Sequence, residues 1–192
     1  MEAYNYRMQE DALWKSFREG NERAFDTLYS TYFPKLYNYG IRICQDKDLV
    51  KDCLQGLFID IWQRKETLSE VKSVKYYLFK SLRRKVVKEL TSQQKFKNEQ
   101  DLEENYSFEV TFSHEFVLIA NQITTDNHDR LLNAFQFLTQ RQKEAIFLRF
   151  YENMEYEEIA TLLSLKEVKY ARTLIYRAID VLKSSIRKLA TT

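Results

Sequence analysis

The chain has 192 residues, enough for one domain or two small ones, and its 44% hydrophobic content suffices for compact cores. It contains 1 Pro and 3 Gly, and this shortage of helix-breaking residues predicts an all-α protein. The formal net charge of +2 indicates no class of partner by itself, and Cys44 and Cys53 are too few for a disulfide framework or a zinc set. We interpret them as structural thiols.

No stretch approaches the roughly 18 to 20 apolar residues that a membrane span needs, and the polar residues 1–10 contain no apolar signal core. We therefore expect a cytoplasmic protein without membrane insertion. The sequence also has no Gly-rich phosphate loop, metal-ligand cluster or Ser/His/Asp set with supporting context. We expect no enzymatic activity, no cofactor and no metal site.

Amphipathic helices are predicted over most of the first 63 residues. The first covers residues 11–19, with Leu13, Trp14 and Phe17 facing inward. The second covers residues 22–32, and the region of Pro34 either continues it or restarts it toward Gly40, since proline fits better near a helix start than inside a helix. Asp46 or Asp48 is expected to cap a third helix that ends near Gln63. Its apolar face consists of Val50, Leu54, Leu57, Phe58, Ile61 and Trp62.

A strongly basic helix follows. Residues 64–72 are polar and loop-like, and Ser73 is expected to cap a helix over residues 74–90. The side chains predicted to face inward are Tyr77, Leu78, Leu82, Val86 and Leu90. Seven basic residues and no acid occur between residues 72 and 88, and we expect them to face outward: Lys72, Lys75, Lys80, Arg83, Arg84, Lys85 and Lys88.

Residues 93–127 lose clear periodicity and carry seven acidic residues against two lysines, which predicts an acidic linker between a domain at residues 1–92 and another at residues 128–192. A short helix within residues 114–123 is compatible with this linker. Basic regions on both sides of an acidic connector suggest two contact surfaces for a polyanion.

Helical periodicity returns at Arg130, with Leu131, Leu132, Phe135 and Leu138. Thr139 and Gln142 have the spacing of a capping box, which predicts a helix over residues 141–150. Residues 156–163 and a helix from about Val168 then form a helix-turn-helix pattern. One face of its second helix is apolar, and the other carries Lys169, Arg172, Thr173, Tyr176 and Arg177. This layout suits a helix that offers hydrogen-bond donors to a major groove, although a plain packing unit with a solvated face shares it.

Three segments in fixed order, residues 52–62, 77–85 and 138–178, closely resemble the extracytoplasmic-function (ECF, group IV) sigma factors of bacterial RNA polymerase. The resemblance covers residues 11–90 and 129–189. It implies two helical domains, called region 2 and region 4, that direct promoter recognition and transcription initiation. Residues 171–178 further resemble ECF factors of Bacteroidetes-type bacteria. The partners it implies are core RNA polymerase (its β′ clamp helices and β flap), promoter DNA and an anti-sigma factor.

The resemblance also implies roles for individual residues. Those matched to the helix that docks on the β′ clamp helices are Asp52, Leu54, Gln55, Phe58, Ile59 and Trp62, although Leu54, Phe58 and Trp62 also have core spacing. Those matched to recognition of the −10 element are Lys72, Lys75, Tyr76, Lys80, Arg83 and Arg84. Those matched to the −35 element are Arg149 and Tyr156, as phosphate contacts, and Lys169, Arg172, Thr173, Tyr176 and Arg177.

The chain departs from the family pattern at several positions. Gly56 stands where an acid is usual, Arg84 where many members have Asn, Glu155 at a usual Ser or Thr cap, and Ser164 at a usual turn Gly.

Two other functions fit parts of the sequence. A stand-alone helix-turn-helix regulator would not need the segment 52–62, and a helical interaction protein without a DNA role would not need the run of basic residues.

Overall fold

The computed structural model describes residues 2–92, 106–109 and 133–189. Over these ranges the chain is helical and contains no strand. It divides into two compact units, Met1–Tyr106 and Ser107–Thr192, which confirms the prediction of an all-α protein with two small helical domains. The ends of the predicted linker and the predicted helix at residues 114–123 lie outside the described residues, so the domain boundaries stay a prediction.

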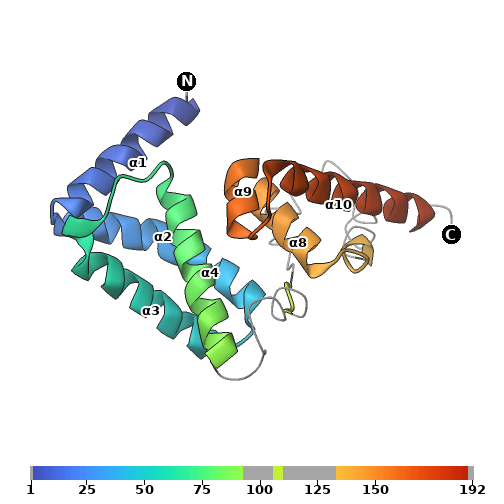
Figure 1. The fold of residues 1–192 in the computed structure, drawn as a ribbon, viewed down its shortest axis with the longest axis horizontal. Coiled ribbons are helices and arrows are strands. Elements are labelled where there is room, and N and C mark those ends of the chain that lie inside the picture. Colours follow the sequence, from blue (N-terminus) through green and yellow to red (C-terminus); the bar gives the residue numbers. More distant parts are fainter. Residues whose placement is uncertain (1, 93–105, 110–132, 190–192) are drawn as a thin grey trace. The chain divides into compact units, whose positions relative to one another are not determined.

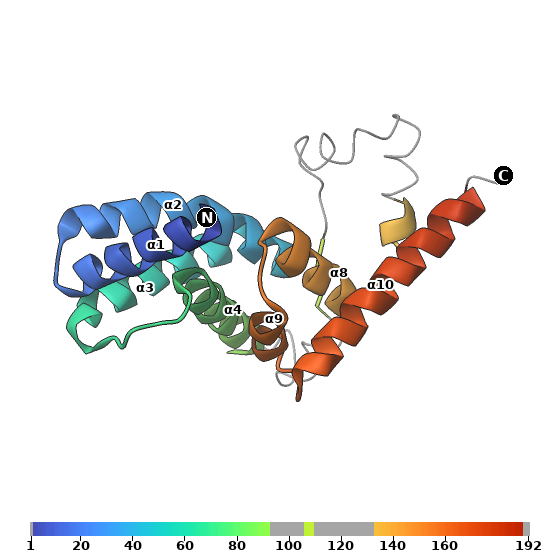
Figure 2. The same ribbon diagram turned by 90° about the horizontal axis from the view of Figure 1, so that it is seen from above.

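The described part of the first unit contains four α-helices: α1 (Glu2–Arg18), α2 (Glu22–Ile43), α3 (Lys47–Gln63) and α4 (Val74–Ser92) (Figure 1). Helix α2 contacts each of the other three helices, and Figure 2 shows α1 and α3 next to it. Phe17, Leu28, Leu36 and Tyr39 are completely buried and form the centre of this core together with Phe79 of α4. The apolar faces predicted from helical spacing are therefore the faces that pack.

Side-chain caps fix where these helices begin. Asn21 Oδ1 accepts a hydrogen bond from the Ala24 amide (3.2 Å), and Asp46 Oδ1 accepts one from the Leu49 amide (3.1 Å). The Ser73 hydroxyl accepts one from the Tyr76 amide (3.1 Å) ahead of α4. Each cap satisfies an amide that has no partner within its own helix. The caps predicted at Asp46, one of two candidates, and at Ser73 are confirmed.

One boundary in this unit differs from the prediction: the first helix begins at Glu2 and not near residue 11. Of the two alternatives open at Pro34, the structure has the continued helix, because Pro34 lies inside α2. Tyr32 and Leu36, on either side of Pro34, are both buried in the same core. Burial of both flanks outweighs the loss of one backbone hydrogen bond, so the helix continues through the proline.

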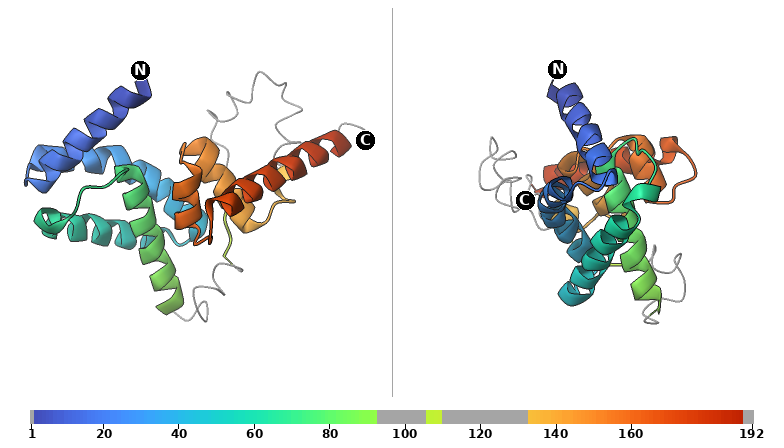
Figure 3. Two further views of the ribbon diagram at one scale, coloured as in Figure 1. Left: turned by 45° about the horizontal axis from the view of Figure 1, so that its top comes forward. Right: turned by 90° about the vertical axis from the view of Figure 1, so that its left-hand side faces the viewer.

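The second unit contains α8 (Gln140–Ile146), a π-helical segment η2 (Phe147–Tyr151), α9 (Tyr156–Leu162) and α10 (Val168–Leu189). Figure 3 shows α10 as a long helix, and it contacts both α8 and α9. The predicted capping box is confirmed. The Gln142 amide donates to Thr139 Oγ1 (3.3 Å), and the Thr139 amide donates to Gln142 Oε1 (2.9 Å).

The predicted helix over residues 141–150 is wrong in its second half. The Glu152 amide donates to the Phe147 carbonyl (3.1 Å), five residues back, and the turn widens to a π-helix. Ile146, Phe147 and Leu148 are all buried. Three consecutive side chains do not all face one side of a regular α-helix, and the wider turn accommodates them.

Phe108 belongs to the segment predicted as a linker, yet it is completely buried in the second unit. Its ring lies 5.7 Å from that of Phe147, and its amide donates to Gln140 Oε1 (2.9 Å). None of the helices in the described part of the chain is long and apolar enough to cross a membrane.

Candidate polymerase and nucleic-acid interfaces

An aromatic groove lies between α2 and α3 in the first unit. Its cavity has a volume of about 690 Å³. Phe25 and Trp62 approach to 4.9 Å between ring centroids, and Tyr29 and Phe58 to 4.8 Å. The residues that line the groove are Glu22, Phe25, Asp26, Tyr29, Phe33, Lys51, Gln55, Phe58, Ile59 and Trp62. We call this surface the α2–α3 groove.

The groove contains four of the six residues matched to polymerase docking. Gln55 and Ile59 are exposed, the latter at 45%, and Trp62 is half-buried. Phe58 is 3% exposed, so it supports the groove more than it offers surface to a partner. Asp52 is exposed on the same helix outside the lining, whereas Leu54 is completely buried and its predicted contact with a partner is wrong. Leu54 follows its core spacing.

The sequence pattern alone does not identify the α2 side of this groove as functional. Phe25, Tyr29 and Phe33 come from α2, and Tyr29 is 41% exposed. Their spacing of four residues places them along one helix face. An aromatic stripe is a common core pattern, however, and only its exposure here distinguishes it as surface.

The loop before α4 is held against α1. It begins with a 3₁₀ turn, η1 (Lys65–Thr67), and Leu68 is buried. The Trp14 indole N–H donates to the Ser69 carbonyl (3.3 Å), and the Trp14 ring meets Tyr77 edge-on at 5.5 Å. The loop that precedes the basic helix is thus fastened to the core through Leu68 and Ser69.

The basic residues of this region fall into different environments. Lys72, Lys80 and Arg84 are exposed, and Lys75 and Tyr76 are half-buried, with Lys80 Nζ 5.4 Å from the Tyr76 ring centroid. The prediction that all the bases face outward is wrong for Arg83, which is 8% exposed. Arg83 lies four residues from the buried Phe79 and Val87, on the packed side of α4.

A second cavity of about 400 Å³ lies between α3 and α4, next to the loop. Buried Leu57, Ile61 and Leu68 contribute to its lining, and Arg64 and Arg84 are exposed at it. The residues that complete the lining are Asp60, Tyr77, Ser81, Lys85, Lys88 and Glu89. Lys85 Nζ is 2.6 Å from Asp60 Oδ2, so this lysine is engaged within the protein.

The helix-turn-helix of the second unit has the predicted geometry. The turn after α9 closes with the Leu165 amide donating to the Ala160 carbonyl (2.8 Å), and Ser164 has a φ of +54°. Ser164 therefore occupies the left-handed conformation that suits the usual glycine. Ala171, Ile175 and Ala178 are completely buried. The five predicted base-facing residues of α10 are all exposed: Lys169, Arg172, Thr173, Tyr176 and Arg177.

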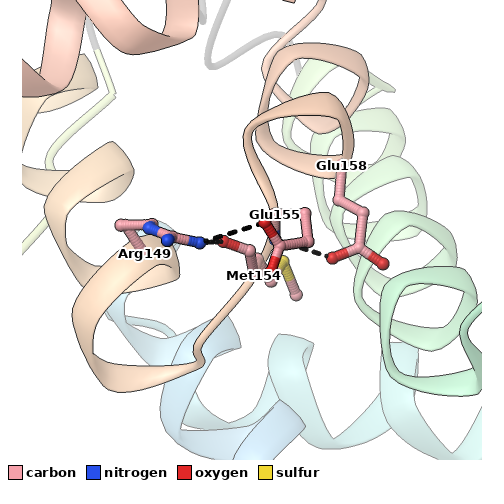
Figure 4. A network of polar contacts seen from close by, with 4 residues as sticks. All are labelled: Arg149, Met154, Glu155 and Glu158. Atoms are coloured by element: carbon pink, nitrogen blue, oxygen red, sulfur yellow. Dashed lines mark hydrogen bonds and ion pairs between the residues drawn. The ribbon is translucent and has the colours of Figure 1, made fainter.

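Arg149 precedes the helix-turn-helix in the sequence and is bound to residues at the start of α9 (Figure 4). Its Nη1 donates to the Met154 carbonyl (2.7 Å) and lies 3.4 Å from Glu155 Oε2. The Glu155 amide in turn donates to Glu158 Oε2 (2.9 Å), which caps the start of α9. The Arg149 guanidinium also lies 4.7 Å from the centre of the Tyr156 ring, and that of Arg172 lies 5.3 Å from the same point.

Both cysteines are buried thiols in the first unit. Burial, with a smaller contribution from the Glu89 charge, raises the pKa of the Cys53 thiol to about 11. The described residues contain no cluster of three or more His, Cys, Asp or Glu side chains arranged to hold a metal ion.

The two units match two parts of one protein family. Residues 28–96 match the family model "Sigma-70 region 2", and residues 128–180 match "Sigma-70, region 4". Together these segments span well over half of the chain, in the order that the resemblance implied. The chain belongs to the sigma-70 family. It is an RNA polymerase sigma factor, and the stand-alone regulator is not favoured.

Individual relatives agree with this assignment. The sigma factor is 24% identical over 170 residues to the ECF RNA polymerase sigma factor SigX of Bacillus subtilis (strain 168), covering 88% of this chain and 86% of SigX. Its fold is similar to that of the sigma factor RpoE in complex with the anti-sigma factor NepR from Bartonella quintana (TM-score 0.56, 19% identity, 85% and 96% of the two chains). It is also similar to CnrH in complex with the cytosolic domain of CnrY (TM-score 0.56, 18% identity, 93% and 97%).

Proposed function

We propose that this sigma factor is of the ECF type and that its two units divide promoter recognition between them. The first unit binds core polymerase through the exposed face of α3 and the α2–α3 groove. Its loop 64–73 and the exposed bases of α4 bind the −10 element. The second unit reads the −35 element with the exposed face of α10 and contacts the β flap. The observation that carries the proposal is the presence, in one chain, of an exposed aromatic groove on the region 2 unit and a basic helix-turn-helix face on the region 4 unit.

The groove supports protein docking because it combines aromatic side chains with a polar rim. Exposed Tyr29 and Ile59 supply apolar surface, and Glu22, Asp26 and Lys51 supply charge at the edge. Interfaces typically have this apolar centre and polar rim. Asp52 and Gln55 are exposed polar residues of α3 and are suited to set the register of a docked helix.

The α10 face supports reading of duplex DNA because its donors are exposed and lie on one side of a packed helix. Arg172 and Arg177 present guanidinium groups, which bind guanine N7 and O6 in a bidentate manner. Thr173 and Tyr176 add hydroxyl and apolar contacts. The exposed lysines Lys72 and Lys80 in the first unit suit a phosphate backbone, and the half-buried Tyr76 ring suits stacking on an unpaired base.

Regulation by an anti-sigma factor is part of the proposal. The RpoE structure to which this fold is similar contains such a partner. A protein that covers the α2–α3 groove would compete with core polymerase for it. The assignment to a Bacteroidetes-type subgroup rests on the pattern of residues 171–178 and remains a proposal. So does a cytoplasmic location.

Run-off transcription with purified core polymerase tests the proposal. A promoter library selected with the reconstituted holoenzyme should yield paired −10 and −35 elements, and transcripts should require the added chain. The double variant Asp52→Arg/Gln55→Ala should abolish association with core polymerase without loss of ellipticity. Glu19→Arg, an exposed charge reversal at the end of α1, serves as the control and should bind normally. Polymerase-independent promoter binding, or normal association of the double variant, contradicts the proposed division.

A further inference from the structure

We propose that Tyr156 is a positioning residue whose aromatic ring holds Arg149 and Arg172 in place for DNA, rather than a residue that binds a phosphate through its hydroxyl. The inference deepens the proposed function and rests on it, since it concerns how the second unit reads the −35 element. It differs from the role that the family resemblance implied for Tyr156. It rests on the contacts of one ring with two arginines from different elements.

The geometry joins three elements of the second unit. Arg149 lies in the π-helical segment η2, Tyr156 is the first residue of α9, and Arg172 is in α10. The two guanidinium carbons lie 4.7 Å and 5.3 Å from the centroid of the Tyr156 ring. Both distances are within the range of about 6 Å in which an aromatic ring attracts a cation. One ring therefore orients a residue outside the helix-turn-helix and a residue on its second helix.

Glu155 fixes the position of the Arg149 guanidinium beside the Tyr156 ring. Arg149 Nη1 bonds the Met154 carbonyl and pairs with the Glu155 carboxylate, whose side chain is largely exposed (Figure 4). Two cations beside one ring repel each other, and a carboxylate on one of them reduces that repulsion. The acid at the position where the family usually has Ser or Thr thus has a local role.

An arginine side chain that is already ordered before DNA binds favours binding, because a long, exposed side chain otherwise loses rotamer entropy when it becomes bound. The rotamer entropy of a free arginine side chain is large. Among the described residues the Tyr156 hydroxyl makes no hydrogen bond, so its removal leaves the arrangement of the two guanidinium groups intact. The ring and the hydroxyl can therefore be separated by substitution.

The test compares Tyr156→Phe, which keeps the ring, with Tyr156→Leu, which keeps apolar bulk without it. Holoenzyme binding is measured on the selected −35 duplex and on duplexes with one altered position. We expect Phe to bind within about twofold of wild type, and Leu to bind about five- to tenfold more weakly, from the loss of two exposed cation–ring contacts. The Leu variant should also relax specificity at the promoter position that Arg172→Ala relaxes. Equal losses for Phe and Leu indicate a hydroxyl–phosphate contact and overturn the proposal.

A double-mutant cycle distinguishes the loss of the ring contacts from local misfolding of α9. In an Arg172→Ala background, Tyr156→Leu should cost less than half of its fold-change in wild type, because one of its two contacts is already absent. A misfolded α9 would reduce binding by the same factor in both backgrounds, and that result would overturn the proposal.

Side-chain NMR of the full chain separates this inference from the proposed function. The Nε–H signals of Arg149 and Arg172 should be displaced by the ring in wild type and in Tyr156→Phe, and should return toward ordinary values in Tyr156→Leu. Unchanged signals would overturn the positioning role even in an active sigma factor. Displaced signals in a protein that supports no transcription would sustain the arrangement and contradict only the proposed function.

Discussion

Gly40 and Gly56 provide a matched pair of substitutions inside neighbouring helices. Gly56 is in α3, and a methyl group added there would meet Lys85 Nζ at 3.6 Å, an ordinary contact. Gly40 is buried in α2, and a methyl group there would meet Val50 Cγ1 at 2.7 Å. The same change, Gly→Ala, therefore tests helix propensity at one site and packing at the other.

The two substitutions are expected to change the free energy of unfolding in opposite directions. At Gly56, alanine should stabilise the first unit by about 0.8 to 1 kcal/mol, the difference in helix propensity. At Gly40 this gain is offset by overpacking against a completely buried valine, which costs about 1 to 3 kcal/mol. We expect a net destabilisation of roughly 1 kcal/mol for Gly40→Ala.

Tryptophan fluorescence during urea unfolding is a suitable assay, because both tryptophans of the chain, Trp14 and Trp62, are in the first unit. With a denaturant slope of about 1 to 2 kcal/mol/M, the midpoint should rise by about 0.5 to 1 M for Gly56→Ala and fall by a similar amount for Gly40→Ala. A lower midpoint for Gly56→Ala, or a higher one for Gly40→Ala, refutes the reasoning. Association of Gly56→Ala with core polymerase should be unchanged, since the position carries no side chain for a partner to contact.

Other expectations follow from single features. Arg83→Ala should destabilise the first unit by about 1 to 3 kcal/mol in urea titrations because it empties a buried site, whereas Arg84→Ala should leave the midpoint in place and weaken −10 binding. Ser164→Gly should raise the midpoint of the second unit by relieving about 1 kcal/mol of left-handed strain, and an unchanged or lower midpoint would argue against such strain. Cys53 should resist a thiol reagent at pH 8 in the folded chain and react in denaturant. The reason is that a thiol pKa raised from 9.0 to about 11 leaves about a hundredfold less thiolate. Rapid labelling of Cys53 in the folded protein would contradict its burial. Arg149→Ala should weaken all promoters alike, unlike Arg172→Ala, which should alter one promoter position.

Local sequence signals predicted much of the fold because caps and helical periodicity are local properties. Asp46, Ser73 and the Thr139–Gln142 pair each satisfy backbone amides within three residues, so short spacing was enough to locate them. The prediction failed at η2, which widens because Phe147 and Leu148 are both buried. At Pro34 the sequence left a continued or a restarted helix open, and α2 continues because the core holds both flanks of the proline.

The site was less predictable than the fold for a related reason. A helical face can be assigned from spacing, but exposure depends on what packs against it. Leu54 and Ile59 were matched to the same partner surface, yet one is completely buried and the other is 45% exposed. Likewise, Tyr156 contacts two arginines that lie 7 and 16 positions away in the sequence, and no sequence pattern encodes that approach.

The basic helix α4 shows why a count of charged residues overstates contact with DNA. Seven bases occur without an acid at residues 72–88, but Arg83 is buried and Lys85 is paired with Asp60 at 2.6 Å. A buried or paired cation releases few counterions when DNA binds, so it adds little to the salt dependence of affinity. The exposed cations along the outer face of α4 include Lys80 and Arg84. The number of cations that α4 presents to solvent is therefore set by the packing of α3 against α4 as much as by composition.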